Sequence, residues 1–377
     1  MSISILGSSG SVGRQTVDVA VHLGITVDAI SVGSNIDEAE KQIRLLRPTL
    51  CAVADKEKAK ELAIRVKDTP CRIAGGDEGV IEAAAFEKSD TVVNSIVGMA
   101  GLLPTLAAID SGKKKIALAN KETLVCAGEI VMSRAKEKGC CIFPVDSEHS
   151  AIYQCLAGGN KIKKILLTAS GGPFFGKTKE ELLNVDLKKT LSHPTWNMGA
   201  KITVDSATLA NKGFEVIEAC HLFGVTPDDI QVVVHRESII HSMVEFEDNC
   251  VIAELSLPDM RECIQYALTY PERKPSKTES LDFYALSGLT FHKPDGESFP
   301  LLPFACRCFT LGGVIPSVLN GANEEAVKLF LNGKISFADI TEKVISVTEK
   351  FENVVCPSLD DIINCGMEAR RRVAASI

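Results

Sequence analysis

The amino-acid sequence predicts an α/β protein: a Rossmann-like, doubly wound parallel sheet at the N-terminus, a central α+β domain and a small C-terminal α-helical domain. Three observations support this class. Short β-branched runs alternate with helical patterns up to about residue 145, strand-like segments with a hairpin signal follow, and helical periodicity dominates after residue 304. The 377 residues, 45% of them hydrophobic, are enough for about two or three domains.

The first predicted domain covers residues 1–145. Its second strand, at 27–32, leads into a helical segment at 37–47, which Pro48 ends because proline cannot continue a helix. Further strands are predicted at 50–53, 91–96, 115–119 and 140–145. The alternation of strands and helices predicts parallel strands joined by crossover helices.

The remaining chain divides into three predicted parts. The central α+β domain, 146–269, contains predicted strands at 162–168, 231–234, 239–246 and 251–257, the last two joined as a hairpin. A proline-rich linker follows at 270–303. Residues 304–377 form the helical domain, with helices predicted at 323–331, 337–351 and 359–375.

Composition and charge exclude several classes of protein. The formal charge is −8 and no block of Lys and Arg stands out, so we expect no nucleic-acid partner. No apolar run approaches the roughly 18 residues of a membrane-spanning helix, and the N-terminus enters a strand at once, which predicts a cytoplasmic protein without membrane contact. The 13 cysteines are scattered, with no C-x-x-C pair, and are interpreted as buried thiols.

A glycine-rich turn follows the first strand. In the sequence from Gly7 to Gly13, glycines let the backbone bring amides to an anion at a helix N-terminus, which favours a pyrophosphate site. The spacing is not G-x-G-x-x-G, and such turns also occur without a ligand. The second strand ends in Gly33, Ser34 and Asn35, whose neutral side chains favour NADPH over NADH; alternatively this segment only caps the next helix.

Two carboxylates, Asp146 and Glu148, stand at the end of a predicted strand, where alternation places both on one face. A hard cation such as Mg²⁺ or Mn²⁺ would relieve their repulsion, with Glu215 as a candidate third ligand. The alternative is that Asp146 or Ser147 caps the following helix.

The segment from Asp205 onwards predicts one helix that starts at cap-type residues and ends at Phe223. Asn211 and Glu215 would share a face, with Lys212 adjacent, and a Ser, an Asn and a Lys near a helix start favour a phosphate site. An ordinary capped helix with a polar face is the alternative.

Three shorter motifs add to these. Ser170 followed by two glycines could form an anion nest or only a tight turn. The loop near 191–200 holds the only tryptophan, Trp196, and suggests a lid, although Trp196 could equally pack in the core. Lys121, just past a strand's carboxyl end, could stabilise charge on a substrate oxygen.

Together and in this order, these motifs resemble the 1-deoxy-D-xylulose 5-phosphate reductoisomerases. The resemblance runs from Gly7 to about residue 324, and its most specific pieces are 118–122, 145–149, 170–174 and 205–215. It departs at Ser34, where a lysine can stand near the 2′-phosphate, which weakens the predicted preference for NADPH over NADH. It departs again at Arg236 and Glu237, where a Pro-Gln pair is common.

The resemblance implies roles for named residues. NADPH contacts would be Ser9, Gly10, Ser11, Val12, Gly33, Ser34, Asn35, Asn120, Glu122 and Gly199. One divalent cation would be bound by Asp146, Glu148 and Glu215, which with Lys121 are the expected catalytic residues. Substrate-binding residues would be Lys121, Ser147, Glu148, Ser170, His193, Trp196, Ser206, Asn211, Lys212 and Glu215, with the phosphate at Ser170, Ser206, Asn211 and Lys212. Trp196 and Met198 would belong to the lid.

The implied activity is the rearrangement and NADPH-dependent reduction of the sugar phosphate 1-deoxy-D-xylulose 5-phosphate to 2-C-methyl-D-erythritol 4-phosphate, a step toward isoprenoid precursors, in a homodimer. Domain 146–269 would be catalytic. Two rival hypotheses stay open: an oxidoreductase of the semialdehyde dehydrogenase type with Cys126 as nucleophile, and a non-catalytic NADPH-binding sensor.

Overall fold

The computed structural model describes residues 1–113, 115–159, 161–196 and 198–377. Contacts divide the chain into two compact units. Unit 1 comprises Met1–Thr123, Glu129–Ser150 and Asp259–Glu279; unit 2 comprises Leu124–Gly128, Ala151–Pro258 and Ser280–Ile377. The four-part domain division expected from the sequence stays a prediction.

Unit 1 is built on a seven-stranded parallel sheet in the order β4-β3-β2-β1-β5-β6-β7. The strands are β1 Ser2–Leu6, β2 Thr26–Val32, β3 Leu50–Val53, β4 Arg72–Gly75, β5 Thr91–Asn94, β6 Lys115–Leu118 and β7 Cys141–Pro144. The chain proceeds outward from β1 to β4 and then returns to β5 on the other side. The expected doubly wound sheet is confirmed, and its topological switch point lies between β1 and β5.

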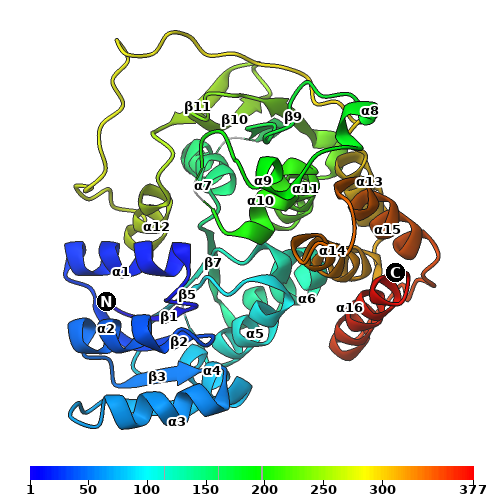
Figure 1. Ribbon diagram of the computed structural model, residues 1–377. Coiled ribbons are helices and arrows are strands. Elements are labelled where there is room, and N and C mark those ends of the chain that lie inside the picture. Colours follow the sequence, from blue (N-terminus) through cyan, green and yellow to red (C-terminus); the bar gives the residue numbers. More distant parts are fainter. Residues whose placement is uncertain (114, 160, 197) are drawn as a thin grey trace. The chain divides into compact units, whose positions relative to one another are not determined.

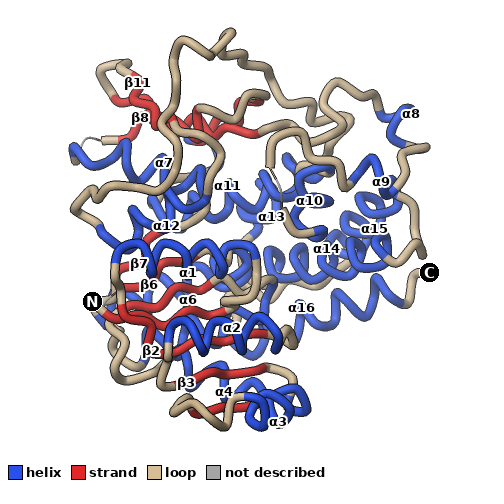
Figure 2. Tube along the Cα trace, turned by 60° about the vertical axis from the view of Figure 1, so that its left-hand side comes forward, coloured by secondary structure: helices blue, strands red, loops and turns tan. Residues whose placement is uncertain are grey.

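Helices follow the strands of unit 1. They are α1 Ser11–Leu23, α2 Ile36–Leu46, α3 Lys56–Arg65, α4 Gly76–Ala84, η1 Gly98–Gly101, α5 Leu102–Asp110 and α12 Met260–Thr269, and α6 Lys121–Lys138 and α7 Ser147–Cys155 begin in this unit. Figure 2 looks onto the side of the sheet that carries α1 and α2. Because helices cover the sheet, β3 and β5 are buried at every position.

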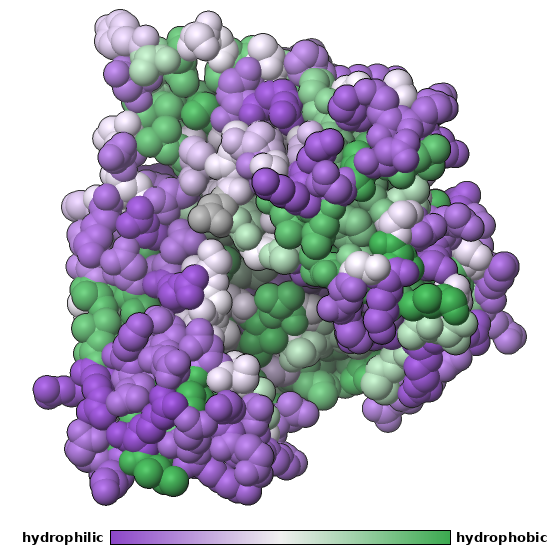
Figure 3. Space-filling view, in the orientation of Figure 1, coloured by the Kyte–Doolittle hydropathy of each residue, from purple (hydrophilic) through white to green (hydrophobic). Residues whose placement is uncertain are grey.

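The ends of these helices follow from local sequence. Helix α2 ends at Leu46, and Arg47 takes a left-handed conformation before Pro48. The predicted end of this helix at Pro48 is therefore confirmed. Its exposed side is polar, as is that of α3. Figure 3 shows the surface formed by these helices, at the lower left, mainly as hydrophilic.

Unit 2 combines a smaller sheet with helices. The sheet has the order β11-β10-β8-β9, with β8 Ile162–Ala169, β9 Ile230–Val234, β10 Ile240–Phe246 and β11 Val251–Leu255. Strands β10 and β11 are antiparallel, so the predicted hairpin is confirmed. The helices wholly within this unit are α8 Lys179–Leu182, α9 Leu187–Thr190, α10 Ala200–Ala207, α11 Ala210–Phe223, α13 Leu301–Leu311, α14 Ile315–Leu331, α15 Phe337–Glu349 and α16 Leu359–Ala374; short turns are η2 Leu156–Gly158 and η3 Pro227–Asp229.

One hydrophobic core joins α10 and α11 to the C-terminal helices. Phe214 and Ile217 of α11 belong to the same buried cluster as Val318 of α14 and Val373 of α16. Helices α14 and α16 approach closely at two glycines, because a side chain at Gly321 would collide with the carbonyl of Gly366. Figure 1 shows α13 to α16, in brown to red, gathered beside α10 and α11.

Two expectations about elements are wrong. The single helix expected from residue 205 to 223 is two helices, because Leu209 adopts φ 58° between α10 and α11. The last residues of the expected linker, 270–303, already belong to α13, whose first turn tolerates Pro303. Among the described residues, no helix is long and apolar enough to cross a membrane.

Candidate active site

The glycine-rich turn links β1 to α1 in unit 1. Gly7 has φ 76°, and a side chain at Gly13 would collide with the Gly7 carbonyl, so both positions require glycine. Gly10 occupies the N-cap of α1, and no side chain caps this helix end. The amides at the start of α1 therefore remain available to an anion. The candidate residues Ser9, Gly10, Ser11 and Val12 all lie here.

The segment Gly33–Asn35 follows β2, and all three residues are exposed. The Asn35 side chain accepts a hydrogen bond from the amide of Glu38 (3.2 Å), so Asn35 caps α2, as the alternative interpretation predicts. The amide of Ser8 donates to Ser31 at the end of β2 (2.8 Å), which holds the glycine-rich turn against this strand end. Both turns thus lie at the carboxyl edge of the sheet, where open α/β sheets bind ligands.

Asn120 and Glu122 follow β6 and are buried. The Asn120 oxygen accepts from the amide of Thr123 (3.0 Å) and caps α6. Its amide nitrogen donates to the carbonyls of Ile96 (2.7 Å) and Gly98 (2.9 Å) and to Glu122 (3.1 Å). Asn120 therefore fastens the loop after β5 to the loop after β6.

Lys121 and Asp146 form an ion pair of 2.6 Å between Nζ and Oδ2, with side chains 7% and 14% exposed. Beside them, the Ser147 hydroxyl donates to Glu148 Oε2 (2.6 Å). The expectation that Asp146 and Glu148 share a strand face is wrong, because β7 ends at Pro144 and Glu148 lies in the first turn of α7. The Asp146 carbonyl accepts the first bond of this helix, from the Ser150 amide (2.8 Å).

In unit 2 a turn with two left-handed glycines follows β8: Gly171 has φ 74° and Gly172 φ 64°. The Ser170 hydroxyl lies 3.0 Å from His193 Nε2 and accepts from the Gly172 amide (3.2 Å). His193 Nδ1 accepts from the amides of Thr195 (3.3 Å) and Trp196 (3.0 Å), so Nε2 carries the proton of the neutral ring. Ser170 Oγ then accepts two hydrogen bonds, which leaves its own proton to donate to a ligand.

Helices α10 and α11 contribute four candidates. Ser206 lies in the last turn of α10, and its carbonyl would be 2.8 Å from a side chain added at Gly172, so the glycine turn rests on this helix end. On α11, Asn211 donates to Glu215 Oε1 and Lys212 pairs with Glu215 Oε2. Glu215 is 1% exposed, and it lies on the same face of α11 as Asn211, as predicted. Ser206 therefore stands at a helix C-terminus, whereas Asn211 and Lys212 stand at a helix start.

The loop near 191–200 packs on unit 2. The Trp196 ring meets the His241 ring edge-on, with centroids 5.9 Å apart, so the alternative reading of Trp196 as a packing residue is supported. Gly199 is exposed at the N-cap of α10, and Asn197 lies outside the described residues. The predicted lid movement stays a prediction.

The expected sites thus form two sets. One, along the carboxyl edge of the unit 1 sheet, holds Ser9 to Val12, Gly33 to Asn35, Asn120 to Glu122 and Asp146 to Glu148. The other, in unit 2, holds Ser170, His193, Trp196, Gly199, Ser206, Asn211, Lys212 and Glu215. Arg236, which the sequence marks only as a departure from the family pattern, contacts the turn at Ser170.

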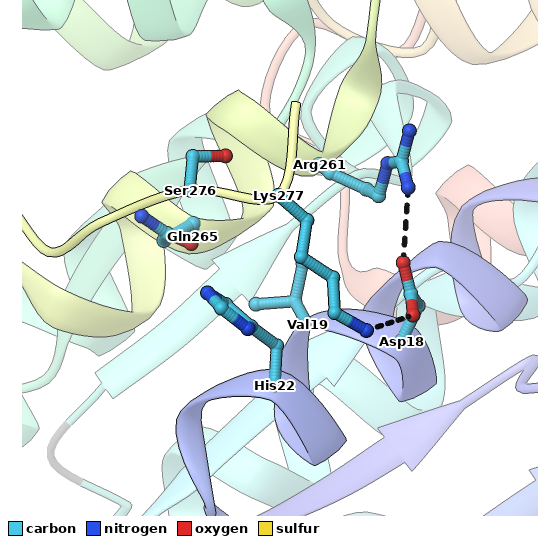
Figure 4. Close-up of a pocket in the computed structure, with 7 residues that line it drawn as sticks. All are labelled: Asp18, Val19, His22, Arg261, Gln265, Ser276 and Lys277. Carbon is cyan, nitrogen blue, oxygen red and sulfur yellow. Dashed lines mark hydrogen bonds and ion pairs between the residues drawn. The ribbon is translucent and has the colours of Figure 1, made fainter. Parts of the chain in front are cut away.

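A separate small pocket, with about 170 Å³ of empty volume, lies in unit 1 between α1, α12 and the segment after α12. Figure 4 shows Arg261 and Lys277 pointing at Asp18, which pairs with both at 3.1 Å. Burial raises the Asp18 pKa, but these two cations outweigh it and leave that pKa below its ordinary value. Arg261 also pairs with Asp259 (2.5 Å), so the two cations face two carboxylates, and none of the predicted site residues lines the pocket.

Matches to known proteins extend over nearly the whole chain. A family model described as 1-deoxy-D-xylulose 5-phosphate reductoisomerase matches residues 3–128. Models of two C-terminal domains of these enzymes match residues 142–223 and 255–372. A 1-deoxy-D-xylulose 5-phosphate reductoisomerase of Acetivibrio thermocellus is 54% identical, with 98% of each chain covered. One of Caldanaerobacter subterraneus subsp. tengcongensis is 52% identical, covering 98% of this chain and 97% of its own.

Solved structures agree. The 1-deoxy-D-xylulose 5-phosphate reductoisomerase from Zymomonas mobilis in complex with NADPH has a TM-score of 0.93 and 37% identity, covering 100% of this chain and 98% of its own. A DOX-P reductoisomerase in complex with NADPH, fosmidomycin and magnesium also has a TM-score of 0.93, at 39% identity and the same coverage.

Proposed function

This chain belongs to the 1-deoxy-D-xylulose 5-phosphate reductoisomerase family, and we infer that its two sets of polar residues are the two parts of that enzyme's active site. It is an enzyme that converts 1-deoxy-D-xylulose 5-phosphate into 2-C-methyl-D-erythritol 4-phosphate with NADPH and a divalent cation. The observation that carries this conclusion is the 54% identity to a reductoisomerase over 98% of both chains.

NADPH is held by the turn Ser9–Val12, by Gly33–Asn35, and by Asn120, Glu122 and Gly199. The uncapped N-terminus of α1 supports this assignment, because its free amides and its dipole both favour a pyrophosphate. The neutral end of β2 supports it too, since a carboxylate there would repel a ribose 2′-phosphate. NADPH supplies the hydride, and the chain binds and orients the nicotinamide.

The divalent cation is held by Asp146, Glu148 and Glu215. Carboxylate oxygens are the ligands that Mg²⁺ and Mn²⁺ prefer, and Asp146 and Glu148 stand two residues apart at the carboxyl end of β7. Lys121 pairs with Asp146 and Lys212 pairs with the buried Glu215, so each of these carboxylates has an opposite charge beside it. Held by these three carboxylates, a cation would supply Lewis-acid stabilisation of the charge that develops on the substrate during rearrangement.

The substrate is held by Lys121, Ser147, Ser170, His193, Trp196, Ser206, Asn211 and Lys212. Its phosphate lies at Ser170, Ser206, Asn211 and Lys212. The remaining donor proton of the Ser170 hydroxyl and the start of α11 support this placement. Trp196 and its loop exclude water above the substrate.

The decisive test is the loss of NADPH absorbance in the near ultraviolet after addition of 1-deoxy-D-xylulose 5-phosphate. We expect oxidation with Mg²⁺ or Mn²⁺, none after chelation, and recovery when either metal is restored. A folded, metal-replete chain that leaves NADPH intact would disprove the function. The thiol-based alternative gains no support from the structure, because Cys126 is 3% exposed within α6.

Three further points belong to this proposal: use of Mn²⁺ as well as Mg²⁺, assembly as a homodimer, and residence in the cytoplasm; of these, only the homodimer rests on the family alone. Sedimentation of the purified chain tests the second point. A single species of about twice the 40.5 kDa chain mass is expected, and a monomer would contradict it.

A further inference from the structure

We propose that Arg236 is a positioning residue that holds the turn Ser170–Gly172 in the conformation that binds the substrate phosphate. The proposal deepens the proposed function, because it assigns a role to a residue outside the expected set. It rests on the contacts of one guanidinium group with both ends of this turn.

Arg236 binds the backbone carbonyls of the turn. Its Nη1 donates to the carbonyl of Ser170 (2.5 Å) and to the carbonyl of Gly172 (2.8 Å). Its guanidinium also lies over the ring of Phe175, 5.1 Å from the centroid. One cation therefore bridges the first and last residues of the turn and stacks on the ring three residues further along the chain.

The conformation of the turn explains why these hydrogen bonds matter. Gly171 and Gly172 both have positive φ, a region where glycine has few steric restraints and many competing conformations. With the two carbonyls bound to Arg236, the Gly172 amide is directed to Ser170 Oγ, and the Ser170 hydroxyl keeps its proton for an anion. Without the guanidinium, both carbonyls would lose a charged partner and the turn would gain freedom.

Arg236 is itself held firmly by its neighbours. The amide of His235 donates to the carbonyl of Ala169 (2.8 Å), which fixes the backbone before it. On the other side, Glu237 accepts from the amide of Thr290 (3.2 Å) and from its hydroxyl (2.7 Å). The ring of His235 stacks on Phe291, with centroids 5.2 Å apart. The guanidinium thus approaches the turn from a rigid support.

Burial adds an electrostatic contribution. Desolvation lowers the pKa of Arg236, which shows that its charge lies partly out of water. A partly desolvated cation beside Ser170 attracts a doubly charged phosphate more strongly than an exposed one does. Arg236 would therefore favour phosphate in two ways, by fixing the turn and by its charge.

The test compares Arg236→Met and Arg236→Lys with the wild-type enzyme. Methionine keeps an apolar stem over Phe175 but cannot donate to the carbonyls; lysine restores the charge and the donors. We expect Arg236→Met to raise the KM for 1-deoxy-D-xylulose 5-phosphate by about tenfold or more, with little change in kcat or in the KM for NADPH. Arg236→Lys should recover much of this loss.

Arg307→Met is the matched control, because Arg307 also stacks on a phenylalanine of unit 2, Phe304, at 4.8 Å, but pairs with exposed Glu349. Its KM values should stay at the wild-type level. An unchanged substrate KM in Arg236→Met, or an equal rise in the KM for NADPH, would overturn the proposal.

A second measurement separates this proposal from the proposed function. Calorimetric titration with inorganic phosphate needs no turnover, so it remains informative even if the wild-type chain does not oxidise NADPH. Phosphate binding that is about tenfold weaker in Arg236→Met than in the wild type supports the role of Arg236. Equal binding in the two proteins, with thermal unfolding showing both folded, contradicts it.

Discussion

At the scale of single residues, Glu215 offers the sharpest test of the metal assignment. Its carboxylate is buried and both oxygens are engaged, by Asn211 and Lys212. Glu215→Gln preserves the shape but removes the charge that a cation needs. We expect kcat to fall by about 100-fold or more, with secondary structure retained in circular dichroism.

Glu325→Gln is the matched control. Glu325 is also a mostly buried glutamate paired with a lysine three residues later, Lys328 at 3.0 Å, but it lies on α14 outside the proposed site. Its loss should lower stability without lowering turnover. Activity near the wild-type level in Glu215→Gln would remove Glu215 from the metal site.

Ser206 tests the phosphate placement. Its alanine variant should lose one hydrogen bond to the phosphate and bind substrate more weakly by about 1 to 3 kcal/mol, seen as a higher substrate KM. Ser317→Ala provides the contrast, because the Ser317 hydroxyl is buried and donates to the carbonyl of Ile362 (2.8 Å). That variant should melt earlier with an unchanged KM. A wild-type KM in Ser206→Ala would argue against a phosphate contact.

Ser34 tests the choice of cofactor. It is exposed at the end of β2, where an aspartate would repel a ribose 2′-phosphate and could instead accept from a 2′-hydroxyl. Two unit charges about 4 Å apart repel by roughly 1 kcal/mol in water and more near a protein surface. Ser34→Asp should therefore raise the KM for NADPH and lower that for NADH. Parallel changes for both cofactors would place the 2′-phosphate elsewhere.

Several of the proposed site residues could be placed at the edge of the sheet from sequence because they follow strands directly. Asn120 and Asp146 each come just after a buried apolar run, and strand ends of a parallel sheet meet at one edge. Glu148 could not be placed, because the chain turns from strand to helix within three residues of Pro144 and strand periodicity no longer holds. Arg236 is noticeable in the sequence only as a departure from the family pattern, and its role could not be inferred there because it depends on a turn 66 positions away in sequence.

At the scale of elements, the turn after β8 should require glycine at position 172 for two reasons, its positive φ and the closeness of its neighbours. A side chain there would be strained by the left-handed conformation and would also meet the Ser206 carbonyl at 2.8 Å. Gly172→Ala should destabilise the fold by about 1 to 3 kcal/mol and raise the substrate KM. Urea unfolding and steady-state kinetics measure the two effects.

Gly176→Ala isolates the contribution of φ. Gly176 has φ 79°, yet nothing lies within 4 Å of an added side chain. The Gly176→Ala variant should lose only the conformational contribution, about 1 kcal/mol of unfolding free energy, and keep wild-type kinetics. Equal losses in both variants would mean that the contact with α10 does not matter.

The elements themselves were predictable to different degrees. Strands such as β3 and β6 were evident because both faces are buried and the residues are almost wholly apolar. The edge strand β4 was missed because its short, half-exposed sequence, Arg72–Gly75, carries no apolar run. The break at Leu209 was missed because leucine is a good helix former, and only tertiary packing keeps it in the left-handed region.

At the scale of the whole molecule, the chain's polar chemistry falls into two units with different tasks. Unit 1 supplies the open N-terminus of α1 and the neutral end of β2, which suit a dinucleotide. Unit 2 supplies the Ser170 turn, the start of α11 and the buried pair of Glu215 and Lys212, which suit a phosphate and a cation. Of the proposed cation ligands, Asp146 and Glu148 belong to unit 1 and Glu215 to unit 2, so we expect catalysis to require both units.

The thirteen cysteines give a test of the whole fold. Eight are buried, two are half-buried and three are exposed: Cys141, Cys250 and Cys356. Thiolates are the reacting species, and burial raises the pKa of Cys220 and of Cys308 to about 12. At pH near 8 these buried thiols are therefore both shielded and protonated. We expect a disulfide reagent to modify at most three thiols quickly in the native chain and all thirteen after unfolding.

The three exposed thiols should also differ among themselves. A hydrogen bond with Asp248 raises the pKa of Cys250, so Cys250 should react more slowly than Cys356. The Cys356→Ser variant should therefore have one fewer fast-reacting thiol. Rapid modification of more than five thiols would show that buried cysteines such as Cys126 are reachable in the native state, and would restore the thiol-based mechanism as a rival. Protection of the eight buried thiols until global unfolding would instead mean that the cysteines serve packing.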